Sequence, residues 1–173
     1  DKLNSFQAHW MMQLPVDEKL AGCLPFLTAA KYIAAEPDDA TKATVRQVIA
    51  ALGDRLKLFS DVLDYEEFFV GDHQLKYDEK AFEKRLKVEG AADLVREFAT
   101  KMETVEPFDA PTLDQMLHQF VEEKHLKIGD IIHALRVAVT GKSQGIGMFE
   151  CLAFLGRKRC LNRIKLSLQR IQD

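Results

Sequence analysis

The sequence of 173 residues contains no long hydrophobic run, few cysteines and no basic, apolar leader. No stretch reaches the roughly 18 uninterrupted apolar residues that cross a bilayer, and the N-terminus lacks the form of a secretory signal. The three cysteines form no C-x-x-C pair, so zinc-ligand spacing is missing and a reduced compartment is indicated. We therefore expect a cytoplasmic protein with no membrane partner. Because the chain begins at Asp rather than Met, we also expect it to be a piece of a longer protein.

Helical periodicity runs through most of the chain, which at 47% hydrophobic residues can bury a core. Evidence for strands is thin, because residues 68–70 and 74–77 could form a small hairpin or simply a loop. The pattern predicts an all-α fold of small helical bundles, with Asp39 as one helix N-cap and Pro111 in the first turn of another helix. The apolar stripes cover residues 45–59, 86–98 with a break at Gly90, 113–121, 128–139, 148–155 and 161–171.

The segment Glu106–Pro111 is the best candidate for a domain boundary. It holds two prolines, which favour the end of one helix and the start of the next. This predicts one helical unit over residues 1–106 and a second over 107–173.

The charge is unevenly distributed along the chain. The net charge of −3 by itself argues against a nucleic-acid binder, but residues 124–173 carry ten Lys or Arg against three Asp or Glu. A basic C-terminal third on an acidic body favours one face offered to a polyanion. A chance asymmetry between solvated helix faces is the competing interpretation.

Local motifs for catalysis or metal binding fail on inspection. Gly141-Lys142-Ser143 resembles the end of a phosphate-binding loop, but Arg136 stands where that motif requires glycine. His118, Glu122 and His125 share a helix face without an H-E-x-x-H motif, so we predict no metal site. No catalytic set of nucleophile and base can be assembled.

A more informative set of residues begins at Leu135. The motifs are Leu135-Arg136-Val137-Ala138-Val139-Thr140-Gly141, Gly147-Met148-Phe149-Glu150, Leu155-Gly156 and Arg163-Ile164. Their order and spacing resemble the C-terminal signature of bacterial glutamyl-tRNA synthetases. Weaker matches upstream, at Lys2-Leu3-Asn4, Leu24-Pro25-Phe26-Leu27 and Tyr65–Phe69, extend the resemblance over essentially the whole chain. Two positions depart from the family: it commonly has proline where Ala134 stands, and often proline where Ile146 stands.

The resemblance implies an anticodon-binding region of a class I glutamate–tRNA ligase, in which two helical units grip the anticodon stem and loop. The implied partner is tRNA for glutamate, with tRNA for glutamine left open, and we expect a monomer. The HIGH-like and KMSKS-like catalytic sequences are absent from this chain. We therefore expect no catalytic residue and no cofactor here, with ATP and Mg²⁺ belonging to a separate catalytic domain that attaches glutamate to tRNA.

The resemblance also implies which residues contact RNA. Arg55 and Arg136 match family anticodon contacts, and an arginine fork can pair with or stack on a splayed base. Arg55 is the residue we would connect with the third anticodon base, with an ion pair to Asp54 or Asp61 as the alternative. The implied base-reading loop comprises Gly145, Ile146, Gly147 and Met148. The implied phosphate contacts are Arg157, Lys158, Arg159, Arg163 and Lys165.

Two rival hypotheses come from other classes of protein. A helical protein-interaction module would explain the helices but not the ordered motifs. A self-standing small enzyme has no catalytic constellation behind it. Salt-dependent RNA binding separates the anticodon-binding hypothesis from the first rival, and turnover by the chain alone would favour the second.

Overall fold

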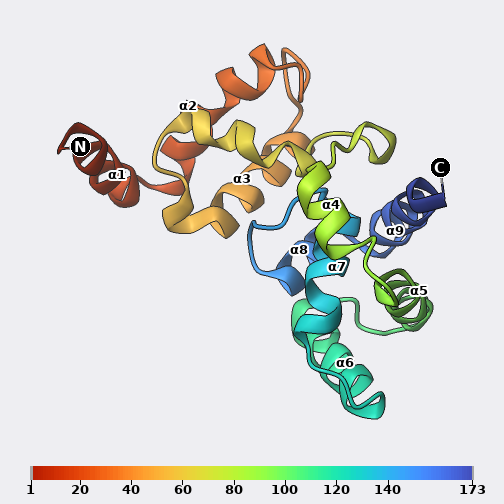
Figure 1. Ribbon diagram of the computed structural model, residues 1–173. Coiled ribbons are helices and arrows are strands. Elements are labelled where there is room, and N and C mark those ends of the chain that lie inside the picture. The colour runs from red at the N-terminus through yellow and green to blue at the C-terminus, as the bar shows by residue number, and fades with distance from the viewer. Residues whose placement is uncertain (1, 173) are drawn as a thin grey trace. The chain divides into compact units, whose positions relative to one another are not determined.

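The computed structural model describes the backbone of residues 2–172 and the side chains of residue 7 and residues 9–172. Within these residues the ordered elements are α-helices and 3-10 helices, without strands, so the predicted all-α class is confirmed (Figure 1). The region around residues 68–77, predicted as a hairpin or a loop, contains the end of one 3-10 helix and a second short one. The side chains of Lys2-Leu3-Asn4, part of the resemblance above, lie outside the described set.

The chain divides into two compact units, residues 1–70 and 71–173. The prolines at 107 and 111 had predicted a division at 106/107, which instead falls inside the second unit. The reason is packing: the helix before these prolines contacts the helices after them, so the prolines mark a turn between neighbours within one core.

The first unit is built on two packed helices. Its elements are α1 (Lys2–Gln13), α2 (Val16–Ala29), α3 (Asp39–Leu52) and the 3-10 helices η1 (Gly53–Arg55) and η2 (Phe59–Phe68). Helix α2 packs on α3 and η2, while α1 contacts η1. The core comes from the predicted stripe on α3 together with residues of α2 and η2. Its buried side chains include Cys23, Leu27, Val45, Val48, Ile49, Leu52, Leu56 and Val62.

Helix α3 begins one residue earlier than its sequence suggested. The carboxylate of Asp38 accepts a hydrogen bond of 2.8 Å from the Thr41 N–H, so Asp38 is the N-cap and Asp39 the first helical residue. The prediction of Asp39 as N-cap was wrong by one position, because two adjacent aspartates present the same cap signal.

The second unit is arranged around α7 (Gly129–Thr140). Its other elements are η3 (Asp72–Gln74), α4 (Glu79–Arg85), α5 (Ala91–Met102), α6 (Ala110–Glu123), α8 (Met148–Leu155) and α9 (Arg157–Gln172). Helix α7 contacts α4, α5, α8 and α9 (Figure 1). Its residues are buried on several sides, as expected for a helix that is apolar around most of its circumference. Phe98 of α5 and Phe120 of α6 meet edge to face at 5.5 Å.

Helix α7 ends at Gly141, which has the left-handed φ of +74°. The Gly141 carbonyl accepts a 2.8 Å hydrogen bond from the Asp78 N–H at the start of α4. A Cβ at position 141 would lie 1.9 Å from the Lys76 carbonyl oxygen. The backbone therefore requires glycine here twice, for its conformation and for this close approach.

The three cysteines are buried, and none of them forms a disulfide within the described residues. Burial raises the pKa of Cys23 to about 12 and also raises the pKa of Cys160, so neither thiol ionises readily near neutral pH. None of the helices in the described part of the chain is long and apolar enough to cross a membrane.

Candidate nucleic-acid interface

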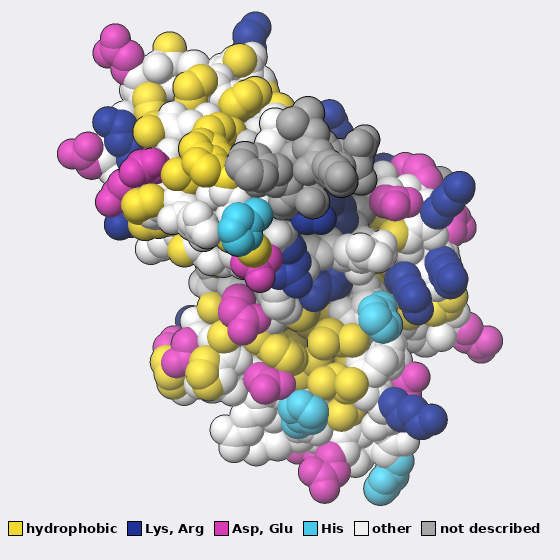
Figure 2. All heavy atoms as spheres, turned by 90° about the vertical axis from the view of Figure 1, so that its left-hand side faces the viewer, with side chains coloured by type: hydrophobic (Ala, Val, Ile, Leu, Met, Phe, Trp, Pro, Cys, Tyr) yellow, Lys and Arg dark blue, Asp and Glu magenta, His cyan; other side chains and the backbone are white. Residues whose placement is uncertain are grey.

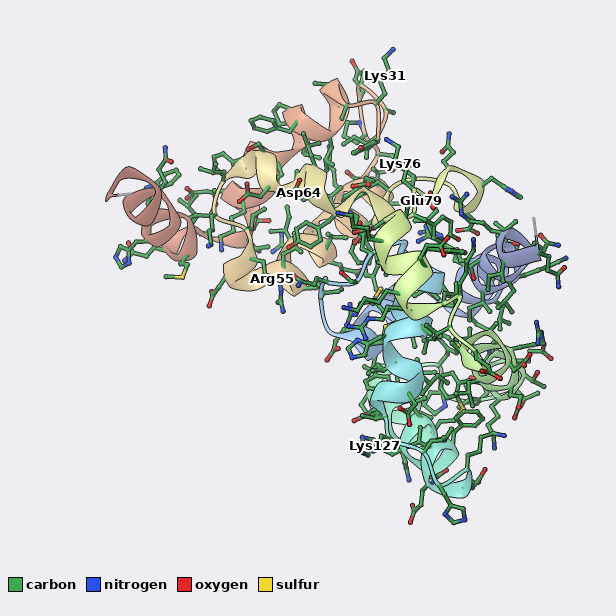
Figure 3. The ribbon with its side chains drawn as sticks, in the orientation of Figure 1. Lys31, Arg55, Asp64, Lys76, Glu79 and Lys127 are labelled. Carbon is green, nitrogen blue, oxygen red and sulfur yellow. The ribbon has the colours of Figure 1, made fainter. Side chains whose placement is uncertain are left out.

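Arg55 lies in η1, directly after α3, and its side chain is exposed (Figure 3). Among the described residues its guanidinium has no hydrogen-bond or ion-pair partner, so the alternative of a salt bridge to Asp54 or Asp61 is not what the structure contains. Asp61 is occupied instead: its Oδ2 accepts the backbone N–H groups of Lys57 and Leu58 at 2.9 and 2.8 Å. These bonds fix the turn that follows η1 and leave the Arg55 fork available to a ligand.

Lys57 adds a second exposed cation two residues from Arg55. Lys57 was not among the predicted RNA contacts, because the resemblance carried no family contact onto that position. An arginine and a lysine on one fixed turn can combine a base contact with a phosphate contact.

The acidic residues in the 3-10 helix that follows, Asp61, Asp64, Glu66 and Glu67, differ in exposure. Glu67 is buried, whereas Asp64 is exposed (Figure 3). Carboxylates of this segment therefore belong partly to the interior and do not form a uniform solvated face.

The loop between α7 and α8 is anchored by its own side chains. Ile146 and Met148 are each only 3% exposed, so their side chains face the interior, and base reading by this loop, which stays a prediction, falls to the groups that remain exposed. The apolar surfaces of these two side chains are buried in the unit, which stabilises the loop. The exposed positions are Ser143, Gln144 and Gly147. What the loop offers to a ligand is therefore small polar side chains and backbone.

Arg136 approaches this loop from α7. Its Nη1 donates a 2.8 Å hydrogen bond to the Ile146 carbonyl oxygen. Its side chain is half-buried, and its predicted contact with an anticodon base stays a prediction. One turn later, the Thr140 hydroxyl oxygen lies 2.8 Å from the Arg136 carbonyl and accepts the Lys142 N–H at 3.2 Å.

Arg163 was expected to contact phosphate, and this expectation is wrong because its side chain is fully buried. Its Nε donates to Asp72 Oδ1 at 2.8 Å, and its Nη1 donates to the Val139 carbonyl at 2.8 Å. The same carboxylate accepts from Arg159 Nε at 3.3 Å and from Asn162 at 2.9 Å. Asp72 thus binds three side chains of α9, and both arginines stabilise the fold of the second unit.

The electrostatics of Asp72 fit this role. Burial alone would raise the pKa of its carboxyl group, but the hydrogen bonds from Asn162 and Arg163 and the charge of Arg163 outweigh burial and hold the pKa below its usual value. Asp72 therefore stays ionised to a lower pH than an ordinary aspartate. No local sequence pattern could have revealed it, because its arginine partners lie some ninety residues further along the chain.

Arg157 was also expected to contact phosphate, and it too turns toward the protein. Its Nε donates to the Met102 carbonyl at 3.1 Å, and its Nη2 donates to the carboxylate of Glu106 at 2.7 Å and to the Val105 carbonyl. The guanidinium also lies 5.3 Å from the centre of the Phe108 ring. Arg157 therefore braces the α5–α6 connection against the start of α9.

Lys158 and Lys165 remain as exposed cations of α9 without an ion-pair partner in the described part of the chain. Several other surface cations are paired, for example Arg170 with Glu79 and Lys124 with Glu97. On the face shown in Figure 2, acidic side chains lie among the lysines and arginines. The basic count of the C-terminal third thus overstates the charge available to a polyanion.

The imidazoles of α6 make ordinary contacts. His118 lies 3.3 Å from the Asp114 carboxylate, and His125 follows the end of the helix with a positive φ of 55°. The described residues contain no group of three or more His, Cys, Asp or Glu side chains that could hold a metal ion.

The chain is similar to known proteins along nearly its whole length. A family model described as "Anticodon binding domain" matches residues 18–168. A glutamate–tRNA ligase from Herpetosiphon aurantiacus is 33% identical over 164 residues, which cover 95% of this chain and 33% of that protein. One from Salinispora arenicola is 34% identical over 173 residues, covering 98% and 36%. The chain thus spans about a third of the length of these relatives.

The fold also has counterparts among solved structures. A glutamate tRNA ligase from Elizabethkingia meningosepticum, solved in complex with its amino acid, covers 97% of this chain with a TM-score of 0.81 at 20% identity. The chain corresponds to 32% of that structure. A glutamate–tRNA synthetase from Elizabethkingia anophelis gives a TM-score of 0.75. At these identities the likeness supports the helical fold, and neither this likeness nor the relatives favour the rival of a protein-interaction module.

Proposed function

Since the chain belongs to the anticodon-binding domain family, we propose that it recognises the anticodon of tRNA for glutamate as part of a glutamate–tRNA ligase. The observation that carries the proposal is Arg55, an exposed guanidinium on a turn fixed by Asp61. It has the five-donor fork that suits an unpaired base, and the structure gives it no protein partner among the described residues.

The proposed role of each residue follows from the exposure of its side chain or backbone. Arg55 reads a base edge, with Lys57 on a neighbouring phosphate. The backbone between half-buried Gly145 and exposed Gly147 approaches a second base, since neither glycine carries a side chain of its own. Lys158 and Lys165 of α9 add phosphate contacts that raise affinity without reading sequence.

Several finer properties belong to the same proposal. The ligase as a whole attaches glutamate to tRNA with ATP and Mg²⁺ in a catalytic domain distinct from these helices, and it acts in the cytoplasm as a monomer. Arg55, through the third anticodon base, decides whether tRNA for glutamine is also accepted.

Nuclease protection of tRNA for glutamate tests the proposal. The chain should protect nucleotides of the anticodon loop and the adjacent stem, and leave the acceptor end open to cleavage. The matched control is the same tRNA with its anticodon replaced, which should be protected only at higher protein concentration. Equal protection of both tRNAs, or protection confined to the acceptor end, would contradict anticodon recognition.

A further inference from the structure

The loop between α7 and α8 is fixed by buried side chains and by a hydrogen bond to Thr140. Ile146 and Met148 bury their side chains in the second unit, and the Thr140 hydroxyl holds the Lys142 N–H at the start of the loop. Between these anchors lies the Gly145–Gly147 stretch, whose glycines would lose the most conformational freedom on being fixed. The hydrogen bond from Arg136 Nη1 to the Ile146 carbonyl falls in the middle of that stretch.

The Arg136 guanidinium lies against the backbone of the loop and can support it. A Cβ built on Gly145 would lie 3.4 Å from Arg136 Nη1, so the arginine passes directly alongside Gly145 as well as Ile146. Arg136 itself comes from α7, where the flanking Leu135 and Val137 are buried. The backbone of Arg136 is thus fixed by its buried neighbours, and its guanidinium group fixes the loop.

We infer that Arg136 is a positioning residue for base recognition: it holds the Gly145–Gly147 backbone in the shape that meets RNA, and it does not itself read a base. This inference rests on the proposed function and reassigns a residue expected to contact the anticodon directly. A loop that is already ordered loses little entropy on binding, so its polar groups can discriminate between bases. A mobile glycine-rich loop would bind native and altered anticodons more equally.

The test uses the whole chain and three substitutions. Arg136→Met keeps an unbranched apolar stem but removes the guanidinium donors, Arg136→Lys keeps a cationic donor, and Lys158→Gln removes an exposed cation. Each protein is titrated with a transcript of tRNA for glutamate and with the same transcript carrying a replaced anticodon, across a salt series. Hydrogen exchange of the Gly145–Met148 amides is followed without RNA.

Arg136→Met should reduce the preference for the native anticodon by about tenfold, the usual scale of one well-placed hydrogen bond. Its salt slope should match that of the unsubstituted chain, and the loop amides should exchange faster. Arg136→Lys should restore most of the preference and the slow exchange. Lys158→Gln should weaken binding to both transcripts equally and reduce the slope by roughly 0.7, as one lost phosphate contact does.

Two results would overturn the inference. One is a smaller salt slope for Arg136→Met with loop exchange unaltered, which would make Arg136 a direct RNA contact. The other is unchanged preference and exchange. If Arg136→Met does not fold, loss of loop protection in a folded Arg136→Lys protein overturns it as well. Failure of the unsubstituted chain to prefer the native anticodon would instead contradict the proposed function, and the exchange data would still decide whether Arg136 fixes the loop.

Discussion

At the scale of single residues, the basic side chains differ in what they touch. Arg163 and Arg159 meet Asp72, Arg157 meets the α5–α6 connection, and Arg136 meets Ile146. Arg55 is exposed without a partner in the described residues. A count of charges along the sequence treats all of these alike, although only an unpaired, exposed cation adds freely to the attraction of a polyanion.

Arg55→Ala should weaken binding to tRNA for glutamate by about 1–3 kcal/mol, the range for a lost bidentate base contact. The loss should be smaller for a tRNA altered at the third anticodon base, because the contact is then already missing. Thermal stability should change little, since the side chain is exposed. Titration of both tRNAs with both proteins measures the effect.

Lys57→Ala is the matched control for Arg55→Ala, because it removes a neighbouring exposed cation. Lys57→Ala should weaken binding to both tRNAs equally. If Arg55→Ala behaves in the same way, Arg55 is only a charge contact and does not read a base.

Asp72→Asn should destabilise the second unit by about 3 kcal/mol, because a neutral amide replaces the carboxylate that is paired with the fully buried Arg163 guanidinium. Chemical denaturation measures this loss. Lys158→Ala, on the same helix as Arg163 but exposed, should stay within about 0.5 kcal/mol of the unsubstituted chain. A loss for Asp72→Asn as small as that of the control would show that the buried pair contributes little.

The sequence predicted the burial and contacts of individual side chains least well. Arg163 and Arg55 are the same amino acid, and no local pattern states that one is buried on Asp72 and the other exposed. Ile146 and Met148 belong to the loop that the resemblance assigns to base reading, and their side chains are nevertheless buried. The resemblance located the loop correctly on the chain but could not tell which of its atoms face outward.

At the scale of elements, the apolar stripes located most of the helices from residue 39 onward. The stripes at 45–59, 113–121, 128–139, 148–155 and 161–171 fall on α3 and on α6 to α9, and the part of the 86–98 stripe after Gly90 falls on α5, because a stripe of three- and four-residue spacing has one stable way to be buried. The break at Gly90 and the helix entry at Pro111 were also found where predicted. No stripe predicted α1, α2, α4 or the 3-10 helices. For η2 the reason is its irregular pattern of acidic and aromatic residues, which carries no clear period.

The end of α7 offers a matched comparison of two glycines. Gly141→Ala should cost more stability than Gly90→Ala, although the two φ values, +74° and +78°, are nearly equal. Alanine at position 141 meets the Lys76 carbonyl, whereas nothing lies within 4 Å of a Cβ at position 90. Gly90→Ala should therefore lose only the roughly 1–2 kcal/mol of a left-handed residue.

The free energies of unfolding of the two variants are measured and compared. The extra loss in Gly141→Ala reports the cost of crowding the close approach between the end of α7 and the segment before α4. Equal losses would mean that the Lys76 backbone shifts aside without cost.

At the scale of the whole molecule, the chain is two units whose division the prolines did not reveal. The sequence places its strongest helix-breaking signal at 106–111, but helix α5 packs on α6 and α9 within the second unit. Which helices share a core is decided by contacts between distant segments, and a turn signal reports only where the chain reverses.

Stability should fall in acid. Hydrogen bonds to the carboxylates of Asp38 and Asp109 hold their pKa values below the usual value, and for Asp72 such bonds outweigh the opposing effect of burial. A depressed pKa in the folded state stabilises the protein above the unfolded pKa of about 3.9, and this contribution is lost as pH falls through the folded value. Unfolding midpoints should be flat from pH 7 to about 5 and decline below about 4.

Asp72→Asn provides the check on the acid prediction. Because that variant has no carboxyl group at position 72 to protonate, its decline in acid should be shallower than that of the unsubstituted chain. An equally steep decline would exclude Asp72 as a source of the acid sensitivity.

Binding of the unsubstituted chain to tRNA for glutamate, compared with the same tRNA carrying a replaced anticodon across a salt series, tests the central claim most directly. We expect clear preference for the native anticodon at every salt concentration. We also expect log–log slopes that correspond to a few phosphate contacts at roughly 0.7 to 0.9 each and are equal for the two tRNAs. Equal affinity for both tRNAs, or no binding to either at low salt, would contradict anticodon recognition by this chain.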